Sequence, residues 1–376
     1  MKTISLGNIL PEAFLRDYWQ KKPLLVRNAL PGFAGLLAVD ELVNLACQDS
    51  SQSRLITRED GEWDVQGDML TVADFANLDN KQWTLLVHDV NHYFMAAHDL
   101  LHQFSFIPYA RLDDLMVSFS PKGGGIGPHA DSYDVFLLQG MGSKRWQISA
   151  QQNNDLIDDI PLKILRDFIP EQEWVLDPGD MLYLPPNYAH NGVAEDDCMT
   201  CSVGFRAPSH QEICEQFLMY LQDHISINGR YSDPDLALQP SPSEISTSML
   251  HKTSAILSDI QWDKTDVEKF LGIYLTEPKA HVFFDPPVNP LSQEKFMRQV
   301  VNVGVRLDLK SQLLARKNIF YINGDEFTVG DDSRFLLETF ANKKKLLIEK
   351  AVSQEISGLF YQWYRCGYIS LINEVN

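Results

Sequence analysis

Cysteine and long apolar runs are both scarce in this sequence. The 376 residues include five cysteines, a small and odd number that does not fit the disulfide framework of a secreted domain. No run reaches the roughly 18 apolar residues of a membrane span, and the N-terminal residues lack the apolar stretch of a signal peptide. We therefore expect a soluble, cytoplasmic protein without membrane contact.

Positive charge is scarce as well. The chain has 32 Lys and Arg residues against 51 Asp and Glu residues, which gives a formal net charge of −19. Residues 285–376 hold 12 basic and 11 acidic residues, so residues 1–284 hold the other 20 basic and 40 acidic ones. An anionic surface repels phosphate backbones and attracts cationic proteins. We expect a basic protein as partner and no direct binding of nucleic acid.

Apolar residues, in contrast, are plentiful. Hydrophobic residues make up 44% of the chain and aromatic residues 11%, enough to bury a core, and the length predicts two or three domains. In the N-terminal part, the apolar spacing predicts helices over 11–20, 39–50 and 71–79 and strands over 24–27 and 83–87. The protein thus begins with mixed helices and strands.

Between about Asp113 and Pro208, short apolar runs alternate with turn residues. The six runs are LMVSFS, YDVFLLQG, KRWQIS, WVL, MLYLP and MTCSVGF. Short strands with Gly and Pro between them predict an all-β barrel or sandwich.

Helical spacing returns at 211–227 and again at 243–275. In the second helix four apolar residues are expected to be buried: Leu250, Ile256, Leu257 and Ile260. The proline-rich segment 284–290 then marks a domain boundary. After it, a short strand and turn at 320–330 and a final helix around 346–365 indicate a small α+β module, in which Lys343–Lys345 is expected to be a solvated helix start.

A candidate metal site lies within the β region. His129 and Asp131 are two residues apart in PHAD, a spacing that places both on one face of an extended chain. His190 follows after two turns, at Pro178-Gly179 and Pro185-Pro186, which can bring it back beside the first pair. Two histidines and one carboxylate leave three octahedral positions open, as in non-haem Fe(II) oxygenases.

Two further residues give this weak motif a context. Lys144 shares a strand face with Trp146 and Ile148, and a buried ammonium group is costly unless it meets an anion such as a dicarboxylate ligand. The alternative is a lysine that reaches solvent or forms a salt bridge. Ser118 lies on the inner face of its strand, where its hydroxyl can donate to a carboxylate, although serine is common in strands.

Taken together, these residues resemble the Jumonji-C (JmjC) branch of the 2-oxoglutarate-dependent oxygenases, whose catalytic fold is a double-stranded β-helix of the cupin type. Three segments resemble the bacterial ribosomal oxygenases in particular: FLRDYWQKKPLLVRNAL, DDLMVSFSPKGGGIGPHADSYDVFLLQGMGSKRW, and PGDMLYLPPNYAHNG followed by SVGFRAP. The resemblance covers most of the chain. It implies an α+β protein with a catalytic domain over 1–210 (core 113–208), a helical dimerisation region over 211–283 and a winged-helix-like module over 284–376.

The resemblance also implies roles for the site residues. His129, Asp131 and His190 are expected to be the Fe(II) ligands, and Lys144 is expected to bind the distal carboxylate of 2-oxoglutarate, with Ser118 assisting. Related bacterial proteins can have arginine in place of Lys144, and lysine keeps the charge without the bidentate fork. In the implied reaction, O2 and 2-oxoglutarate are consumed, succinate and CO2 are formed, and a C–H bond becomes C–OH.

For the substrate, the resemblance implies an arginine of a large-subunit ribosomal protein, hydroxylated at its β-carbon by a homodimeric enzyme. Three alternatives stay open at this point: a histidine hydroxylase of a ribosomal protein, an N-methyl demethylase, and a cupin-like binding protein without catalysis. The anionic part of the chain fits a basic ribosomal protein as substrate.

Two other motifs carry no predicted chemistry. Cys198 and Cys201 are three apart in a predicted strand and therefore face opposite sides, which argues against a zinc site. The glycines of GGGIG (123–127) lack the ending of a phosphate-binding loop and are expected to form an irregular turn at the barrel mouth.

Overall fold

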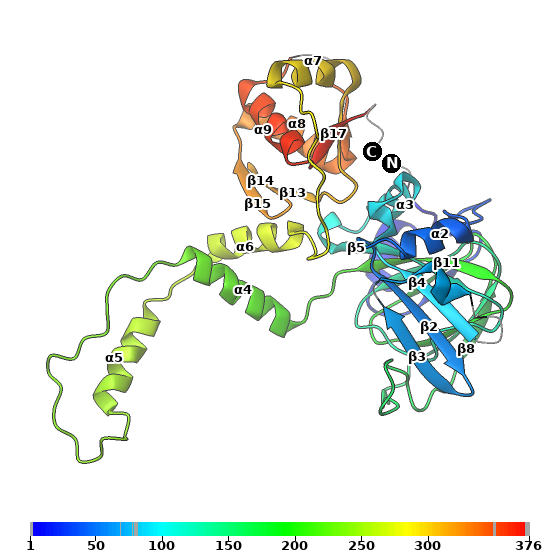
Figure 1. The fold of residues 1–376 in the computed structure, drawn as a ribbon, viewed down its shortest axis with the longest axis horizontal. Helices are drawn as coiled ribbons and strands as arrows, with labels where there is room; N and C mark the ends of the chain where they lie inside the picture. The colour runs from blue at the N-terminus through cyan, green and yellow to red at the C-terminus, as the bar shows by residue number, and fades with distance from the viewer. Residues whose placement is uncertain (1–2, 68, 77, 79–81, 349–350, 373–376) are drawn as a thin grey trace. The chain divides into compact units, whose positions relative to one another are not determined.

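The structure is a computed structural model that describes residues 3–67, 69–76, 78, 82–348 and 351–372. These residues fall into two compact units (Figure 1). Unit 1 comprises Met1–Ala207, Pro278–Ser311 and Asn342–Asn376, and unit 2 comprises Pro208–Glu277 and Gln312–Ala341. Among the described residues, no helix combines the length and the apolar character that crossing a membrane requires.

Eight strands of unit 1 form an antiparallel sheet in the order β1-β9-β6-β11-β5-β4-β2-β3. Their bounds are β1 Leu24–Val26, β2 Ser53–Glu59, β3 Glu62–Gly67, β4 Gln82–Val87, β5 Leu112–Ser120, β6 Val135–Gln139, β9 Met181–Leu184 and β11 Cys198–Phe205. Strands β6, β9 and β11 are buried along their whole length. Continuous burial of this kind requires that both faces of the sheet are covered.

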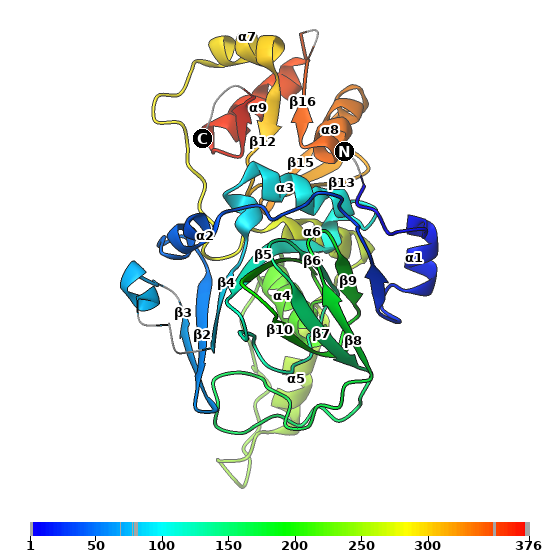
Figure 2. The same ribbon diagram turned by 90° about the vertical axis from the view of Figure 1, so that its right-hand side faces the viewer.

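A second antiparallel sheet, in the order β10-β7-β8, covers one face of the first. Its strands are β7 Lys144–Ser149, β8 Gln172–Leu176 and β10 Ala189–Ala194. Side chains of both sheets join in one core cluster, for example Leu137 and Leu182 from the large sheet with Trp146 and Ile148 from the small one. Figure 2 shows β7 and β8 beside β6 and β9. Two facing antiparallel sheets are the layout expected of a double-stranded β-helix.

N-terminal helices cover the other face of the large sheet. They are α1 Pro11–Asp17, α2 Val39–Ala46 and α3 Met95–Leu101, with short 3₁₀ turns η1 Val72–Phe75, η2 Val90–His92, η3 His102–Phe104 and η4 Tyr109–Arg111. Phe14 of α1 is fully buried against the rings of Phe136 and Tyr183, with centroids 5.4 and 4.9 Å away. The face of β5, β6 and β11 that points away from the barrel interior is thus apolar and packed.

The sequence patterns miss three strands of the two barrel sheets. The hairpin β2–β3 has many charged residues and partly exposed strands, so it lacks a strong apolar alternation. Strand β10 contains Asn191 and Gly192, which have low strand propensity, and it forms because six of its residues pair with β7. The predicted helix over 71–79 is only the 3₁₀ turn η1, and residues 77 and 79 lie outside the described part.

The rest of unit 1 consists of α7 Gln293–Val303, α9 Gln354–Arg365 and a sheet in the order β16-β12-β17 (β12 Val305–Leu307, β16 Lys345–Leu346, β17 Ile369–Leu371). Lys343–Lys345 is not the solvated helix start that the sequence predicts. Lys343 ends a helix, and Lys344 is only 5% exposed, with its ammonium 4.4 Å from the ring centroid of Tyr109. The backbone of Lys344 is tied to β12, with Leu307 N–H donating to Lys344 O.

Unit 2 contains α4 His210–His224, α5 Thr247–Ser258, α6 Lys264–Thr276, most of α8 Asp331–Lys343 and a hairpin sheet in the order β13-β14-β15 (β13 Leu313–Arg316, β14 Ile319–Ile322, β15 Asp325–Thr328). Tyr220 and Phe270 form the contact between α4 and α6, which lie side by side in Figure 1. The segment predicted as one helix over 243–275 is two, because Asp263 caps a new helix by accepting from Thr265 and Asp266 N–H.

The prediction of buried positions in 243–275 is wrong. Leu250, Ile256, Leu257 and Ile260 are 58, 40, 59 and 43% exposed. All residues of α5 are described, and none of them is buried. The apolar spacing is real, but no element in the described part of the chain buries it.

Candidate metal centre

The structure brings His129, Asp131 and His190 together from two segments. His190 is the second residue of β10, and PHAD lies in the connection between β5 and β6. PHAD forms an isolated antiparallel bridge to β10 rather than a strand: His129 N–H donates to His190 O at 2.9 Å, and His190 N–H donates to His129 O at 2.8 Å. Asn187 N–H donates to Asp131 O at 2.6 Å. Backbone pairing therefore sets the separation of the three side chains.

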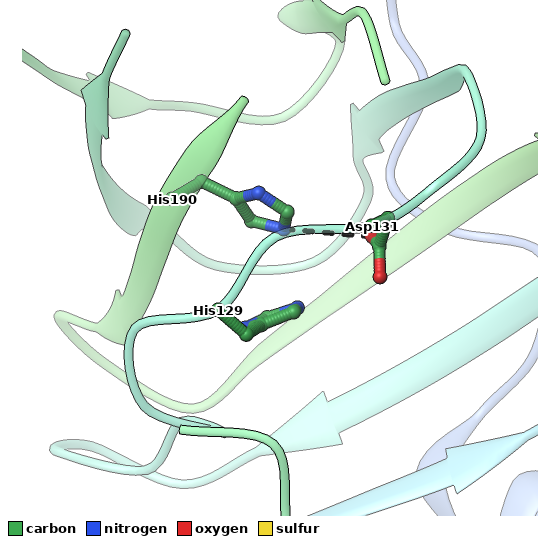
Figure 3. Close-up of side chains that lie close together, drawn as sticks. All are labelled: His129, Asp131 and His190. Atoms are coloured by element: carbon green, nitrogen blue, oxygen red, sulfur yellow. Dashed lines mark ion pairs between the residues drawn. The ribbon is translucent and has the colours of Figure 1, made fainter. Parts of the chain in front are cut away.

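The side chains converge on one point (Figure 3). One ligand atom from each residue lies within 4.8 Å of the others, and no other set of three His, Cys, Asp or Glu residues in the described part of the chain does so. His190 Nε2 is 3.7 Å from Asp131 Oδ2, and the two imidazole rings have centroids 4.2 Å apart. Three donor atoms at these separations can bind a single metal ion.

Backbone carbonyls orient both imidazoles. His129 Nδ1 donates to Gly127 O at 2.9 Å and His190 Nδ1 to Tyr188 O at 2.9 Å, an assignment made from these acceptors. The proton is thereby placed on Nδ1, and each Nε2 keeps its lone pair for a metal. Burial, together with the charge of neighbouring His129, lowers the pKa of His190, so that its imidazole is neutral and able to coordinate. This donor set of two imidazoles and one carboxylate fits Fe(II).

Lys144 lies deep in the barrel, as its strand face predicts. It is 3% exposed, whereas Arg145 beside it reaches solvent. Its ammonium lies 5.1 Å from the ring centroid of Trp146, and burial lowers its pKa, with the neighbouring Cys198 acting in the opposite direction. The described residues offer it no carboxylate, so a buried cation without an anion stands in the same interior as the three candidate metal ligands. A bound dicarboxylate fits this arrangement.

Ser118 faces a polar interior that the sequence reading largely missed. The residue is 4% exposed and pairs in register with Thr200 of β11. Thr200 Oγ1 in turn donates to Gln139 Oε1 at 3.1 Å, and Thr84 and Ser120 share a hydrogen bond of 2.9 Å between their hydroxyls. Alternation within MTCSVGF places Thr200 on the inner face, but its register against Ser118 requires the fold.

The glycine-rich segment 123–127 runs along β10. Gly123 N–H donates to Ala194 O at 2.8 Å, and Ala194 N–H donates to Gly124 O at 2.9 Å. A Cβ on Gly124 would lie 2.4 Å from Trp83 O, and one on Gly125 would lie 2.4 Å from Gly192 O. Only glycine allows this approach, which leads the chain into PHAD.

Two family models match the chain. The model described as JmjC domain matches residues 99–213, and the model described as ROXA-like winged helix matches residues 259–370. They confirm the predicted fold class, a double-stranded β-helix of the cupin type followed by a winged-helix-like α+β module.

Among curated proteins, the chain is 32% identical over 289 residues to the ribosomal protein uL16 3-hydroxylase of Escherichia coli (strain K12), an alignment that covers 75% of each chain. It is 42% identical over 236 residues to the probable ribosomal oxygenase of Haemophilus influenzae, covering 61% of this chain and 56% of that protein. The solved structure of the ribosomal oxygenase YcfD from Escherichia coli, in complex with cobalt and 2-oxoglutarate, aligns with a TM-score of 0.82 at 27% identity, over 99% of this chain and 100% of that one.

Proposed function

Because this chain belongs to the JmjC-domain ribosomal oxygenases, we propose that it hydroxylates the β-carbon of an arginine in the large-subunit ribosomal protein uL16, with Fe(II), 2-oxoglutarate and O2. One structural observation supports the proposal. The cluster of His129, Asp131 and His190 shares its barrel interior with Lys144, a buried cation that has no carboxylate among the described residues. A metal site beside an anion site is what a 2-oxoglutarate oxygenase requires.

In this proposal the three clustered residues hold Fe(II) through His129 Nε2, His190 Nε2 and the Asp131 carboxylate. When bound, iron and 2-oxoglutarate together activate O2, with formation of succinate and CO2 and conversion of a substrate C–H bond into C–OH. The carbonyls of Gly127 and Tyr188 keep the imidazoles in the metal-binding tautomer. His190 lies in the buried part of the site, whereas the Asp131 side chain is 25% exposed and leaves the metal position open to a substrate.

Lys144 and Ser118 bind the distal carboxylate of 2-oxoglutarate in this proposal. The Lys144 ammonium is held in place by its burial and by the Trp146 ring, so little side-chain freedom remains to be lost on binding. The Ser118 hydroxyl is buried and can donate a second hydrogen bond.

The uneven charge supports a basic substrate. A net excess of acidic residues over 1–284 attracts a cationic ribosomal protein towards the catalytic domain and disfavours RNA. We accordingly propose that the protein acts in the cytoplasm, on uL16 itself and without direct contact with nucleic acid. We also propose the division into a catalytic domain (1–210), a helical dimerisation region (211–283) and a C-terminal module (284–376).

We propose that the partner of α5 is a second copy of this chain. Leu250 and Leu257 are more than half exposed on α5, and Leu218, Met219 and Trp262 are more than half exposed nearby in the sequence. An isolated helix of this length is marginal in water, so its apolar side chains need a packing surface. Sedimentation analysis should give a dimer for the wild type and a monomer for Leu250→Asp/Leu257→Asp. An unchanged dimer in the variant would contradict the assignment.

The activity is tested with purified, iron-loaded protein, 2-oxoglutarate and recombinant uL16. We expect succinate formation and a mass increase of one oxygen atom on an arginine of uL16, located by fragmentation of the peptide. Oxygen on a histidine, or formaldehyde released from a methylated peptide, would instead support one of the alternative activities. If neither succinate nor a modified ribosomal protein appears, the cupin-like binding protein is favoured. His129→Ala serves as the inactive control.

A further inference from the structure

The indole nitrogen of Trp146 lies in the barrel interior and has no role in the chemistry above. Trp146 of β7 is 5% exposed, and its indole Nε1 is buried without a hydrogen-bond partner in the described part of the chain. An indole nitrogen can only donate a hydrogen bond, so its partner must be an acceptor. Native proteins rarely leave a buried donor unmatched, because its desolvation is not compensated.

The indole lies between the two parts of the proposed site. Its ring centroid is 5.9 Å from that of the metal-ligand candidate His190 and 5.1 Å from the Nζ atom of Lys144. Register explains the placement, since β7 pairs Ile148 with His190 and Trp146 with Gly192. Every second residue of β7 therefore faces the interior, and Trp146 comes between the cation and the metal cluster.

Gly192 opposite Trp146 makes room for the indole. A Cβ at position 192 would lie 2.8 Å from two atoms of the Trp146 ring and 2.9 Å from Lys144 Cε. The backbone at Gly192 has no positive φ, so alanine is excluded by the neighbouring side chains and not by backbone conformation. The glycine is needed because the indole and the Lys144 side chain occupy that space.

We propose that Trp146 is a cosubstrate-binding residue, whose indole N–H donates a hydrogen bond to bound 2-oxoglutarate while Gly192 keeps the indole in position. The inference rests on the proposed function, because it takes 2-oxoglutarate as the ligand. The neighbouring groups favour this acceptor over a protein atom. Lys144 is itself a donor, and His190 Nε2 is committed to the metal. A carboxylate bound between Lys144 and the metal can accept hydrogen bonds from the lysine and from the indole together.

Trp146→Phe separates the hydrogen bond from the packing, since phenylalanine keeps an aromatic ring and lacks the N–H. In protein loaded with Mn(II), we expect the Kd for 2-oxoglutarate, measured by calorimetry, to rise roughly tenfold or more while the Kd for Mn(II) is unchanged. Trp19→Phe is the matched control, because Trp19 packs in the separate core on the other face of the large sheet. It should leave both constants as in the wild type.

A second measurement follows the N–H itself. In ¹⁵N-tryptophan-labelled protein loaded with Zn(II), the indole N–H resonance that is absent from Trp146→Phe should move downfield when 2-oxoglutarate is added. Should Trp146→Phe fail to fold, Gly192→Ala displaces the same indole and should weaken 2-oxoglutarate binding to a similar degree. In that case the indole N–H resonance that Gly192→Ala shifts is assigned to Trp146. Wild-type affinity in the variant that folds, or an indole resonance that does not move, would overturn the inference. No 2-oxoglutarate binding by the wild type would overturn the proposed function as well.

Discussion

Replacing Lys144 with methionine should change stability and cosubstrate affinity in opposite directions. The side chain is 3% exposed, and burial lowers its pKa. Among the described residues it has no carboxylate partner, so the ligand-free protein bears the cost of desolvating an amine. Methionine has a similar length and no charge. We expect Lys144→Met to stabilise the ligand-free protein by about 1–4 kcal/mol, the range seen when buried ion pairs are replaced by apolar residues.

The same substitution should nearly abolish binding of 2-oxoglutarate. A distal carboxylate that enters the barrel without a cation is a buried charge without a partner, which costs about 3–5 kcal/mol. That cost corresponds to a rise in Kd of roughly a hundredfold to several thousandfold. In the wild type, 2-oxoglutarate should raise the melting temperature by mass action, and in Lys144→Met it should not.

Thermal denaturation with and without 2-oxoglutarate, together with calorimetry on the Mn(II)-loaded protein, measures both effects. Arg145→Met is the control, because Arg145 is the next residue of β7 and pairs on the outside with Glu173 and Glu195. Loss of the Arg145 side chain should lower the free energy of unfolding by about 1 kcal/mol or less and leave the Kd for 2-oxoglutarate unchanged. A Lys144→Met protein that is less stable than the wild type without ligand, or that binds 2-oxoglutarate normally, would refute the reasoning.

Three further predictions concern other parts of unit 1. Asp134 is fully buried and accepts a hydrogen bond from Tyr183 Oη at 2.6 Å. Asp134→Ala should therefore lower the free energy of unfolding, measured by urea denaturation, by about 2–4 kcal/mol. A decrease of less than about 1 kcal/mol would contradict this prediction. Burial lowers the pKa of Lys344 from 10.5 to about 7, so the unfolded state binds more protons between these values and stability rises with pH. At pH 7, Lys344→Met should have the larger free energy of unfolding. The gap between the variant and the wild type should narrow by up to about 1.4 kcal/mol per pH unit above pH 7. A gap that does not change with pH would show that Lys344 is charged when buried. A Cβ on Gly125 would lie 2.4 Å from a backbone oxygen of β10, so Gly125→Ala should weaken metal binding by roughly tenfold or more in a metal titration. Gly358→Ala, with nothing within 4 Å of the new Cβ, should bind metal like the wild type.

The β core could be predicted from the sequence because its signal is local. Runs such as LMVSFS and KRWQIS have strand composition and are bounded by turns, and each of them is a strand in the structure. Strand β10 lacks that composition and forms only through its pairing with β7, so no local pattern indicates it. The same limit applies to α5, whose apolar spacing predicts a helix correctly but does not say whether the partner surface belongs to the same chain.

The candidate site divides in the same way. The spacing of His129 and Asp131, and the strand face of Lys144, can be read from neighbouring residues. The distance of His190 from them cannot, because it depends on the backbone bridge between PHAD and β10. Thr200 and Gln139 were missed for this reason, since a polar residue on an inner face becomes part of a site only through its cross-strand neighbours.

The double-stranded β-helix was implied by a family resemblance. Local pattern by itself determined the β character of residues 113–208, the positions of most barrel strands, the anionic character of residues 1–284 and the residue types available for a metal and a dicarboxylate. These properties depend on composition and on periods of two and 3.6 residues, which any short segment displays. The tertiary structure alone decided that Lys144 has no carboxylate neighbour in the described part of the chain, that the indole of Trp146 lies between this lysine and His190, and that Lys344 is buried. Desolvation and hydrogen-bond satisfaction are properties of an environment assembled from distant segments, and no local pattern contains them.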